Sequence, residues 1–178
     1  MPPMGPMTPE QANAYRQPML DALGADGPVE AQAAEVELWR RLLDDVGSAL
    51  SVRPAPGEWS ALECLGHMAD SEMVTSVRYR WILAEDEPPL QGWDQQAWAT
   101  RLDHSADDPA SLLALFAALR RTNLELWART PIASRARVGI HAERGPESFD
   151  LLFRLQAGHG RVHRAQAERA LADVRPAR

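Results

Sequence analysis

Helical periodicity is the feature that most limits what this chain can fold into. Apolar side chains recur every three or four positions through several long segments, whereas apolar and polar residues never alternate over a convincing stretch. The first spacing places apolar side chains on one face of a helix, and the second is the pattern that a half-buried strand requires. The sequence therefore predicts an all-α fold in which four long helices and one short helix form a four-helix bundle.

Capping and breaking signals set the limits of these helices. Thr8-Pro9-Glu10-Gln11 combines an N-cap, a first-turn proline and a capping-box partner, and Ser60 and Glu63 form a second capping box. Prolines and glycines then interrupt the periodic segments. The expected helices cover about residues 8–23 (disturbed at Pro18), 28–47, 60–84, 108–130 and 148–172.

The order of these segments suggests one main domain. We expect residues 1–27 to form an N-terminal extension with the short helix, and residues 28–178 to form the bundle. Pro88 and Pro89 end the second long helix, and the roughly twenty residues after them form a connection long enough to act as a lid. Residues 132–146 are expected to be irregular or extended.

Charge and cysteine content exclude several classes of protein. The formal net charge of -6 argues against binding to a phosphate backbone, so no nucleic-acid partner is expected. No apolar run is long enough for a membrane span, and the first residues lack the cationic and apolar segments of a signal peptide, so we expect a cytoplasmic protein. The single cysteine, Cys64, excludes an internal disulfide, and its apolar neighbours favour a packing role.

The spacing of two histidines is the strongest chemical signal. His159 and His163 are four residues apart, so on a helix their rings stack one turn apart on the same face, close enough to bind one metal ion. His67, in another helical segment, would be a third ligand. Three histidines leave coordination positions open, which is typical of a catalytic metal. Surface or hydrogen-bonded core histidines are the alternative, because such a pair also arises by chance.

Helical spacing places the histidines on stripes that we expect to face the bundle interior. Bundles commonly hold metals in a polar patch between facing helices, and uncompensated buried imidazoles and carboxylates would otherwise be costly. The stripes consist of Glu63, His67, Asp70, Val74, Val77 and Trp81 in one helix, and Phe149, Leu152, Gln156, His159, His163, Gln166 and Ala170 in the other.

Other residues are candidates for supporting roles. Asp70, one turn after His67, is placed either to accept the free ring N–H of His67 or to act as a base on a water, and a solvated carboxylate is the alternative. Arg78 is placed to bind a carboxylate of a substrate or thiol cofactor, with a salt bridge at a subunit contact as the alternative. His104 and His141 lack ligand spacing and receive no site role. Core positions are expected for Trp39, Trp59, Trp81 and Trp127, and a pocket mouth for Trp93 and Trp98.

Several ordered segments resemble the DinB/YfiT-like superfamily. Residues 53–72, which contain Trp59, Ser60 and His67, resemble the signature of its second helix. Residues 90–98, Arg120, 141–145 and 157–163 follow in the order that the family shows. The resemblance covers about residues 28–172 and ends in the family's histidine spacing.

The resemblance implies a four-helix bundle, often dimeric, so we expect a homodimer. It also implies a divalent metal held by His67, His159 and His163, for which zinc or nickel is expected because both suit imidazole-rich sites. Some relatives carry an additional histidine where this chain has Arg164. That departure would alter the surroundings of the ligands or the substrate pocket.

Two reactions follow from the same resemblance. The first expectation is transfer of a low-molecular-weight thiol, such as bacillithiol or mycothiol, onto an electrophile, with Asp70 as a catalytic residue and Arg78 as a residue that binds the thiol cosubstrate. A metal-dependent hydrolase is the alternative. A further alternative is a non-enzymatic, stress-associated bundle in which the metal stabilises the fold.

Overall fold

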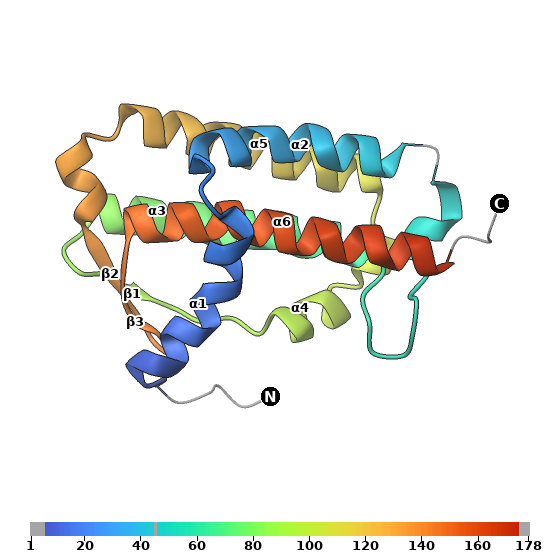
Figure 1. The fold of residues 1–178 in the computed structure, drawn as a ribbon, viewed down its shortest axis with the longest axis horizontal. Coiled ribbons are helices and arrows are strands. Elements are labelled where there is room, and N and C mark those ends of the chain that lie inside the picture. The colour runs from blue at the N-terminus through green and yellow to red at the C-terminus, as the bar shows by residue number, and fades with distance from the viewer. Residues whose placement is uncertain (1–5, 45, 175–178) are drawn as a thin grey trace.

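Four long helices form the body of the structure, a computed structural model in which residues 6–44 and 46–174 are described. The helices α2 (Pro28–Leu43) and α3 (Ala61–Ala84) each pack against both α5 (Pro109–Arg129) and α6 (Phe149–Val174). Figure 1 shows α2 and α5 as one layer and α3 and α6 as the other. This arrangement confirms the prediction of an all-α four-helix bundle. Three predicted segments lie partly outside the described residues: the N-terminal extension (residues 1–5), the helix expected over 28–47 (residue 45) and the end of the bundle (residues 175–178).

Both predicted capping boxes are present. The Ser60 hydroxyl accepts a hydrogen bond from the backbone N–H of Glu63 at 3.2 Å, and the Glu63 carboxylate accepts one from the N–H of Ser60 at 2.9 Å. Thr8 and Gln11 cap α1 (Pro9–Leu23) in the same way, and α1 continues past Pro18. These reciprocal bonds satisfy N–H groups that a helix start leaves unpaired, so the sequence fixes where α1 and α3 begin.

The first long helix ends earlier than expected. It was predicted to reach Gly47, but α2 ends at Leu43 because Asp44 adopts an extended conformation with ψ 132°. A short 3-10 helix, Gly47–Ser51, follows. Gly47 has φ +59°, a backbone conformation that glycine adopts at little cost. The glycine therefore belongs to the turn after the helix rather than to its end.

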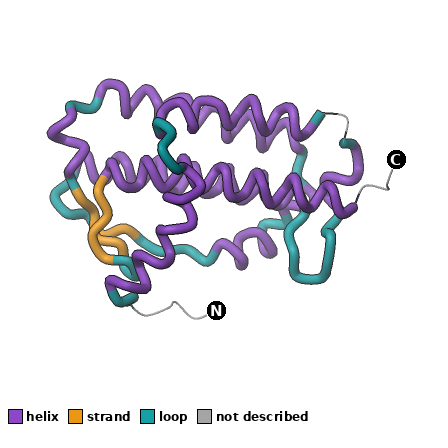
Figure 2. Tube along the Cα trace, in the orientation of Figure 1, coloured by secondary structure: helices purple, strands orange, loops and turns teal. Residues whose placement is uncertain are grey.

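Regular structure occurs in the connection after α3, which was expected to be a loop, and in residues 132–146, which were expected to be irregular or extended. The strand β1 (Pro89–Leu90) pairs in parallel with β2 (Val138–His141), which pairs antiparallel with β3 (Gly145–Ser148). Figure 2 shows this small sheet at one end of the bundle. The connection between α3 and α5 also holds α4 (Gln95–Arg101) and a 3-10 turn, His104–Ala106. Strands of two to four residues are too short for alternation to be visible in the sequence.

The core consists of two apolar clusters with buried polar side chains between them. Trp39 and Phe116 pack with the first half of α3, whereas Tyr79 of α3 packs with Phe149 and Phe153 of α6. Trp39, Trp59 and Trp127 are buried as predicted. The residues between the clusters are Ser71, Glu72, Thr75, Ser76, Arg120, Asn123 and Gln156, all of them buried.

The inward stripe of α3 differs from the predicted one. Val77 and Trp81 are 41% and 39% exposed, so the prediction that they face the interior was wrong. Ser71, Thr75 and Arg78 are buried on that helix instead. Steps of three or four residues from His67 lead either to Val77 and Trp81 or to Ser71, Thr75 and Arg78. The apolar series was predicted to face inward because core positions are usually apolar. Here the interior is polar, so the apolar side chains mark the outer face.

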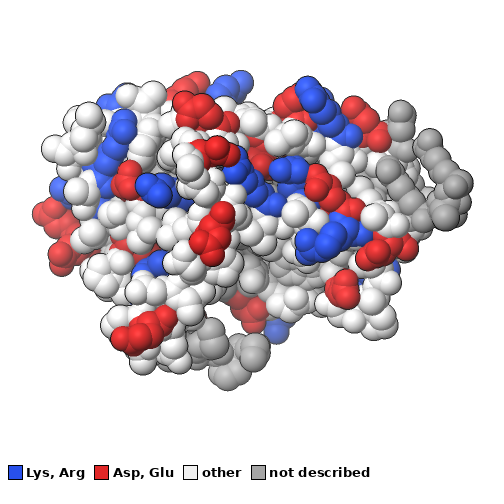
Figure 3. All heavy atoms as spheres, in the orientation of Figure 1, with Lys and Arg blue, Asp and Glu red and all other residues white. Residues whose placement is uncertain are grey.

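The visible surface carries mixed charge. Figure 3 shows acidic and basic side chains interspersed over the face that α2, α6 and α1 present. Among residues 6–44 and 46–174, no helix combines the length and apolarity that crossing a bilayer requires.

Candidate metal centre

Three histidines converge where α3 meets α6. One ring nitrogen from each of His67, His159 and His163 lies within 4.8 Å of the other two. The Nε2 atoms of His67 and His159 are 3.2 Å apart, and the rings of His67 and His163 have centroids 4.4 Å apart. In a tetrahedral zinc site with Zn–N bonds of about 2.05 Å, ligand nitrogens are separated by about 3.3 Å. The spacing of the rings therefore fits one divalent cation.

The antiparallel packing of α3 and α6 brings these residues together. The Tyr79 hydroxyl near the end of α3 donates to the carbonyl oxygen of Leu152 near the start of α6, at 3.4 Å. His67 lies twelve residues before Tyr79 on α3, and His159 lies seven residues after Leu152 on α6. Moving back along α3 therefore corresponds to moving forward along α6, and the two histidines contact each other. His163 follows His159 by one helical turn, as its spacing predicted.

Partial or full removal from water keeps the three rings neutral, since His67 is buried and His159 and His163 are half-buried. Desolvation is the main cause that lowers the pKa of His67 to about 2 and the pKa of His163 to about 4. It also lowers the pKa of His159 well below its usual value. A protonated imidazole has no lone pair for a metal, so low pKa values keep the nitrogens available as ligands at neutral pH.

Neighbouring groups orient two of the rings. The amide oxygen of Gln166 lies 3.0 Å from Nδ1 of His163. Because that oxygen accepts the proton of Nδ1, the lone pair of His163 is on Nε2. The Ser71 hydroxyl lies 3.5 Å from Nδ1 of His159, whereas the buried Nδ1 of His67 has no hydrogen-bond partner.

Asp70 makes no hydrogen bond to His67. Its carboxylate lies 2.8 Å from Nε2 of His104, so the predicted hydrogen bond from His67 to Asp70 was wrong. Nδ1 of His104 lies 2.7 Å from Asp107. Burial opposes protonation of His104, but its hydrogen bonds with Asp107 and Asp70 raise its pKa. Action of Asp70 as a base stays a prediction.

The position of His104 depends on Gly66 of α3. A Cβ atom on Gly66 would lie 2.4 Å from the His104 ring, so only a glycine allows this close approach. In the sequence, a glycine inside a helix beside His67 indicates that another group packs closely there. The sequence does not show that this group is His104, because His104 is distant in the chain.

Two tryptophans enclose the cluster. Trp93 stacks on His67 with ring centroids 5.4 Å apart and an interplanar angle of 19°. Trp59 packs against His67 and His163 at 5.0 and 5.9 Å. Trp98 packs against Trp93 at 4.7 Å. The predicted connection after α3 thus places Trp93 at the site, and Trp98 supports it.

A cavity of about 600 Å³ extends from the histidines along the groove between α3 and α6. Tyr15 and Met19 of α1 form part of its wall, opposite polar groups of the bundle. Arg78 lies in the same cavity and is only 6% exposed. The residues from the two groove helices are His67, Ser71, Thr75, Arg78, Leu152, Leu155, Gln156 and His159.

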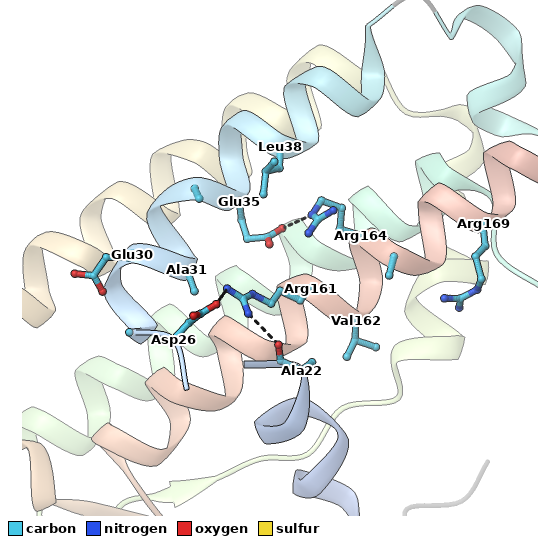
Figure 4. Close-up of a pocket in the computed structure, with 13 residues that line it drawn as sticks. Ala22, Asp26, Glu30, Ala31, Glu35, Leu38, Arg161, Val162, Arg164 and Arg169 are labelled. Atoms are coloured by element: carbon cyan, nitrogen blue, oxygen red, sulfur yellow. Dashed lines mark hydrogen bonds and ion pairs between the residues drawn. The ribbon is translucent and has the colours of Figure 1, made fainter. Parts of the chain in front are cut away.

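A second hollow, of about 920 Å³, lies between α2 and α6 and contains none of the three histidines. Its charged groups are largely paired with one another: Arg164 contacts Glu35 at 3.2 Å and Arg161 contacts Asp26 at 2.6 Å, as Figure 4 shows. Arg164 thus lines this hollow and not the cavity beside His67 and His159.

Comparison with known sequences gives related proteins with a shared description. Residues 30–167 match the sequence profile of the DinB superfamily. "Putative metal-dependent hydrolase YfiT" of Bacillus subtilis is 34% identical over 59 residues, 33% of each chain. "Putative metal-dependent hydrolase OB0782" of Oceanobacillus iheyensis is 28% identical over 109 residues, 61% of this chain and 63% of the relative. The chain thus matches less than two thirds of the length of these two relatives.

Longer matches have lower identity. "Putative metal-dependent hydrolase BCB4264_A2719" of Bacillus cereus is 24% identical over 151 residues, 85% of this chain and 87% of the relative. Among solved structures, YfiT from Bacillus subtilis, described as "a probable metal-dependent hydrolase with an unusual four-helix bundle topology", matches with a TM-score of 0.69. That match covers 96% of this chain and 91% of the other at 22% identity, so it concerns the fold.

Proposed function

Because the chain belongs to the DinB superfamily, we propose that it is an enzyme dependent on a divalent cation bound by His67, His159 and His163. The convergence of three ring nitrogens, with the rings of His67 and His159 lining a cavity, carries this proposal. Three protein ligands leave coordination positions for a reactant, whereas structural zinc usually has four. The relatives' shared name supports metal dependence.

The residues around the cluster orient its nitrogen atoms and cover its rings. A bound divalent cation would act as a Lewis acid and lower the pKa of a water or thiol in its open position. Gln166 keeps the proton of His163 on Nδ1, which directs Nε2 towards the cluster. Trp59 and Trp93 pack on the His67 ring and exclude water from its faces. A dry, oriented site strengthens electrostatic interactions with a reacting group.

Within this class, we propose thiol transfer as the first reaction. The thiol loses its proton, its sulfur forms a bond to an electrophilic carbon, and the leaving group departs with the bonding electrons. A thiolate is a soft ligand that suits zinc or nickel, and a cavity of about 600 Å³ has the size of a small-molecule site. The family resemblance supports bacillithiol or mycothiol as the type of cosubstrate.

Hydrolysis is the second candidate reaction. The names of the relatives favour it, since each describes a metal-dependent hydrolase. The same three histidines would serve both reactions, because a water and a thiol compete for the same open position. The two candidates differ only in the nucleophile, so a direct comparison of substrates distinguishes them.

Metal analysis and a histidine substitution test the proposal. We expect one zinc or nickel ion per chain by plasma mass spectrometry, and turnover that a chelator removes and the metal restores. In His67→Ala we expect loss of both the metal and the turnover, with the helical circular dichroism retained. A panel of thiols with an electrophile, and a panel of activated esters, would be assayed in parallel.

The matched control removes a buried histidine outside the cluster. His104→Gln is expected to keep the metal, because His104 contacts Asp70 and Asp107 rather than the ligands. Turnover of esters alone would establish the hydrolase. If the metal-loaded protein turns over neither panel and His67→Ala loses only thermal stability, the site is structural and the enzymatic proposal fails.

We also propose that the protein is a homodimer without nucleic-acid or membrane partners. Met73, Val77 and Trp81 form an exposed apolar stripe on the outer face of α3, which a second copy of the chain would cover in a dimer. Sedimentation velocity of the purified protein would measure the oligomeric state directly.

A further inference from the structure

The cavity has a second polar end, remote from the metal cluster. Arg78 lies eleven residues after His67 on α3, which corresponds to about 16 Å along the helix axis. The sheet brings His141, at the end of β2, to the same place. The guanidinium of Arg78 donates a hydrogen bond to the carbonyl oxygen of Gln91. The same guanidinium lies 3.4 Å from Nε2 of His141.

The contacts of His141 determine which of its nitrogens carries the proton. Nδ1 accepts hydrogen bonds from the backbone N–H groups of Glu143 at 3.1 Å and Arg144 at 3.3 Å. A nitrogen that accepts from two donors has no proton, so the neutral ring carries its proton on Nε2. Burial lowers the pKa of His141 to about 4, which keeps the ring neutral at physiological pH.

Two donors therefore face each other with no acceptor between them. The N–H of Arg78 cannot donate to His141 Nε2, because that nitrogen is itself protonated. Buried donors without an acceptor are costly, so a site of this kind favours a ligand that accepts from both. Proteins also bind anions through hydrogen-bond donors that converge on one position.

The charges around this end leave Arg78 without an anionic partner. Among the described residues, no carboxylate forms an ion pair with Arg78. The nearby Glu147 already contacts Arg16 at 3.2 Å and Arg144 at 2.7 Å. Glu143 lines the cavity but its carboxylate lies beside Gly92. Burial lowers the pKa of Arg78 only to about 10, so the guanidinium remains charged at neutral pH.

We propose that Arg78 and His141 bind a carboxylate of the substrate or cosubstrate, and that this molecule extends along the cavity to place its reacting group at the histidines. One guanidinium and one imidazole N–H match the single charge and two oxygens of a carboxylate. Between the two ends, the cavity presents Leu152 and Leu155 beside the polar groups of Ser71 and Gln156. The substrate class is thus an elongated carboxylic acid. This inference deepens the proposed function, because it describes the same cavity.

Binding of a simple acid to metal-free protein tests the anionic end alone. The probe is octanoate, with octan-1-ol as its uncharged counterpart, and affinity is measured by isothermal titration calorimetry. We expect octanoate to bind at least about 10-fold more tightly than octan-1-ol. In Arg78→Gln this preference should disappear, and in Arg78→Lys part of it should remain.

The matched control is Arg80→Gln, which removes the same charge from the same helix. Arg80 is exposed and contacts Ser76 and Asn123 outside the cavity, so this variant should retain the preference for octanoate. An absence of octanoate binding by the wild-type protein, or an equal preference in Arg78→Gln, would overturn the proposal. Thermal melting of each variant shows whether it is folded.

Nuclear magnetic resonance of the histidine rings provides a test that needs no substitution. In protein with ¹⁵N-labelled histidine, we expect the Nε2–H tautomer for His141 and a shift of its Nε2 resonance when octanoate is added. The Nδ1–H tautomer, or a resonance that octanoate leaves unchanged, would contradict the donor pair. Because these measurements use metal-free protein, their failure leaves the metal proposal standing, and loss of metal from His67→Ala leaves this one standing.

Discussion

The three metal-ligand candidates are held in different ways. His163 contacts Gln166 at 3.0 Å, whereas Nδ1 of His159 lies 3.5 Å from the hydroxyl of Ser71. His67 relies on packing, because its Nδ1 has no partner and Trp93 stacks on its ring. A hydrogen bond to the non-ligating nitrogen fixes the tautomer and orientation of a histidine ligand. Gln166 is therefore a positioning residue for the cluster.

Loss of the Gln166 amide should weaken metal binding without removing a ligand. In Gln166→Leu we expect an affinity for zinc about 10- to 100-fold lower than in the wild type, because His163 loses the acceptor that keeps its proton on Nδ1. Competition with a fluorescent chelator measures this change.

The control for this substitution is an amide on the surface. Gln17→Leu removes a hydrogen bond to Asp21 on the exposed side of α1, so its zinc affinity should equal that of the wild type. Equal zinc affinities for Gln166→Leu and Gln17→Leu would show that Gln166 does not orient the ligand.

The short helix α1 is part of the site although it lies outside the four-helix body. It packs against α6 and supplies Tyr15 and Met19 to the wall of the cavity. The Arg161 guanidinium donates to the carbonyl oxygen of Ala22 at 3.0 Å, which ties the end of α1 to α6. The proposed division at residue 27 stays a prediction. Whatever its outcome, α1 closes one side of the cavity.

A glycine on α6 makes this close packing of α1 feasible. A Cβ atom on Gly158 would lie 1.7 Å from the backbone oxygen of Met19, and backbone cannot move aside without shifting the helix. We expect Gly158→Ala to lower the free energy of unfolding by about 1–3 kcal/mol and to displace α1. Urea denaturation measures the first effect, and faster hydrogen exchange in α1 reports the second.

Gly160→Ala is the matched control on the same helix. Its Cβ would lie 3.2 Å from Cγ of Glu35, a side chain that can adjust by a few tenths of an ångström. Hydrogen exchange in α1 should therefore be unchanged in this variant. If both alanine variants exchange alike in α1, the contact of Gly158 with Met19 does not hold that helix in place.

At the scale of the whole molecule, polar residues between two apolar clusters make room for a cavity inside a bundle. Glu72 forms an ion pair with Arg120 at 2.8 Å and accepts hydrogen bonds from Asn123 at 2.7 Å and Gln156 at 3.0 Å. These contacts satisfy the Glu72 carboxylate in the interior, where an unpaired charge would be costly. The fold is thus supported on both sides of the site, and we expect metal-free protein to remain folded at neutral pH.

The stability of metal-free protein should decrease in mild acid. The folded pKa is about 2 for His67 and about 4 for His141 and His163, against an ordinary value of 6.5. Below pH 6.5 the unfolded chain binds protons that the folded rings do not. The stability that these neutral rings contribute is fully present above pH 6.5 and is lost as the pH falls towards 4, by up to about 1.4 kcal/mol per ring per pH unit.

Chemical denaturation at pH 7.5, 6 and 5 measures this loss. His104, whose pKa is raised, acts in the opposite direction but is a single ring. The variant His163→Gln should show a shallower decrease than the wild type, because it has one neutral ring of lowered pKa fewer. A free energy of unfolding that stays constant or rises from pH 7.5 to pH 5 would contradict the assignment of neutral rings.

Local interactions explain what the sequence by itself determined. Helix starts at Thr8 and Ser60, the all-α class and the pairing of His159 with His163 depend on residues within one or two turns of each other, and all three are found in the structure. Helical periodicity proposed His67 as a third ligand, and the family resemblance supported its link to that pair. Short-range chemistry is visible in a sequence because its partners are neighbours in the chain.

Only the tertiary structure decided which face of α3 is inward and which groups meet across the bundle. Apolar periodicity favoured Trp81 for the core. The interior beside the cavity is polar, so Arg78 is buried on the inner face of α3 and Trp81 lies on the outer face. The contact of Arg78 with His141 depends on a sheet whose strands are too short to predict. Contacts between distant segments depend on the packing of the whole chain, and no local pattern records them.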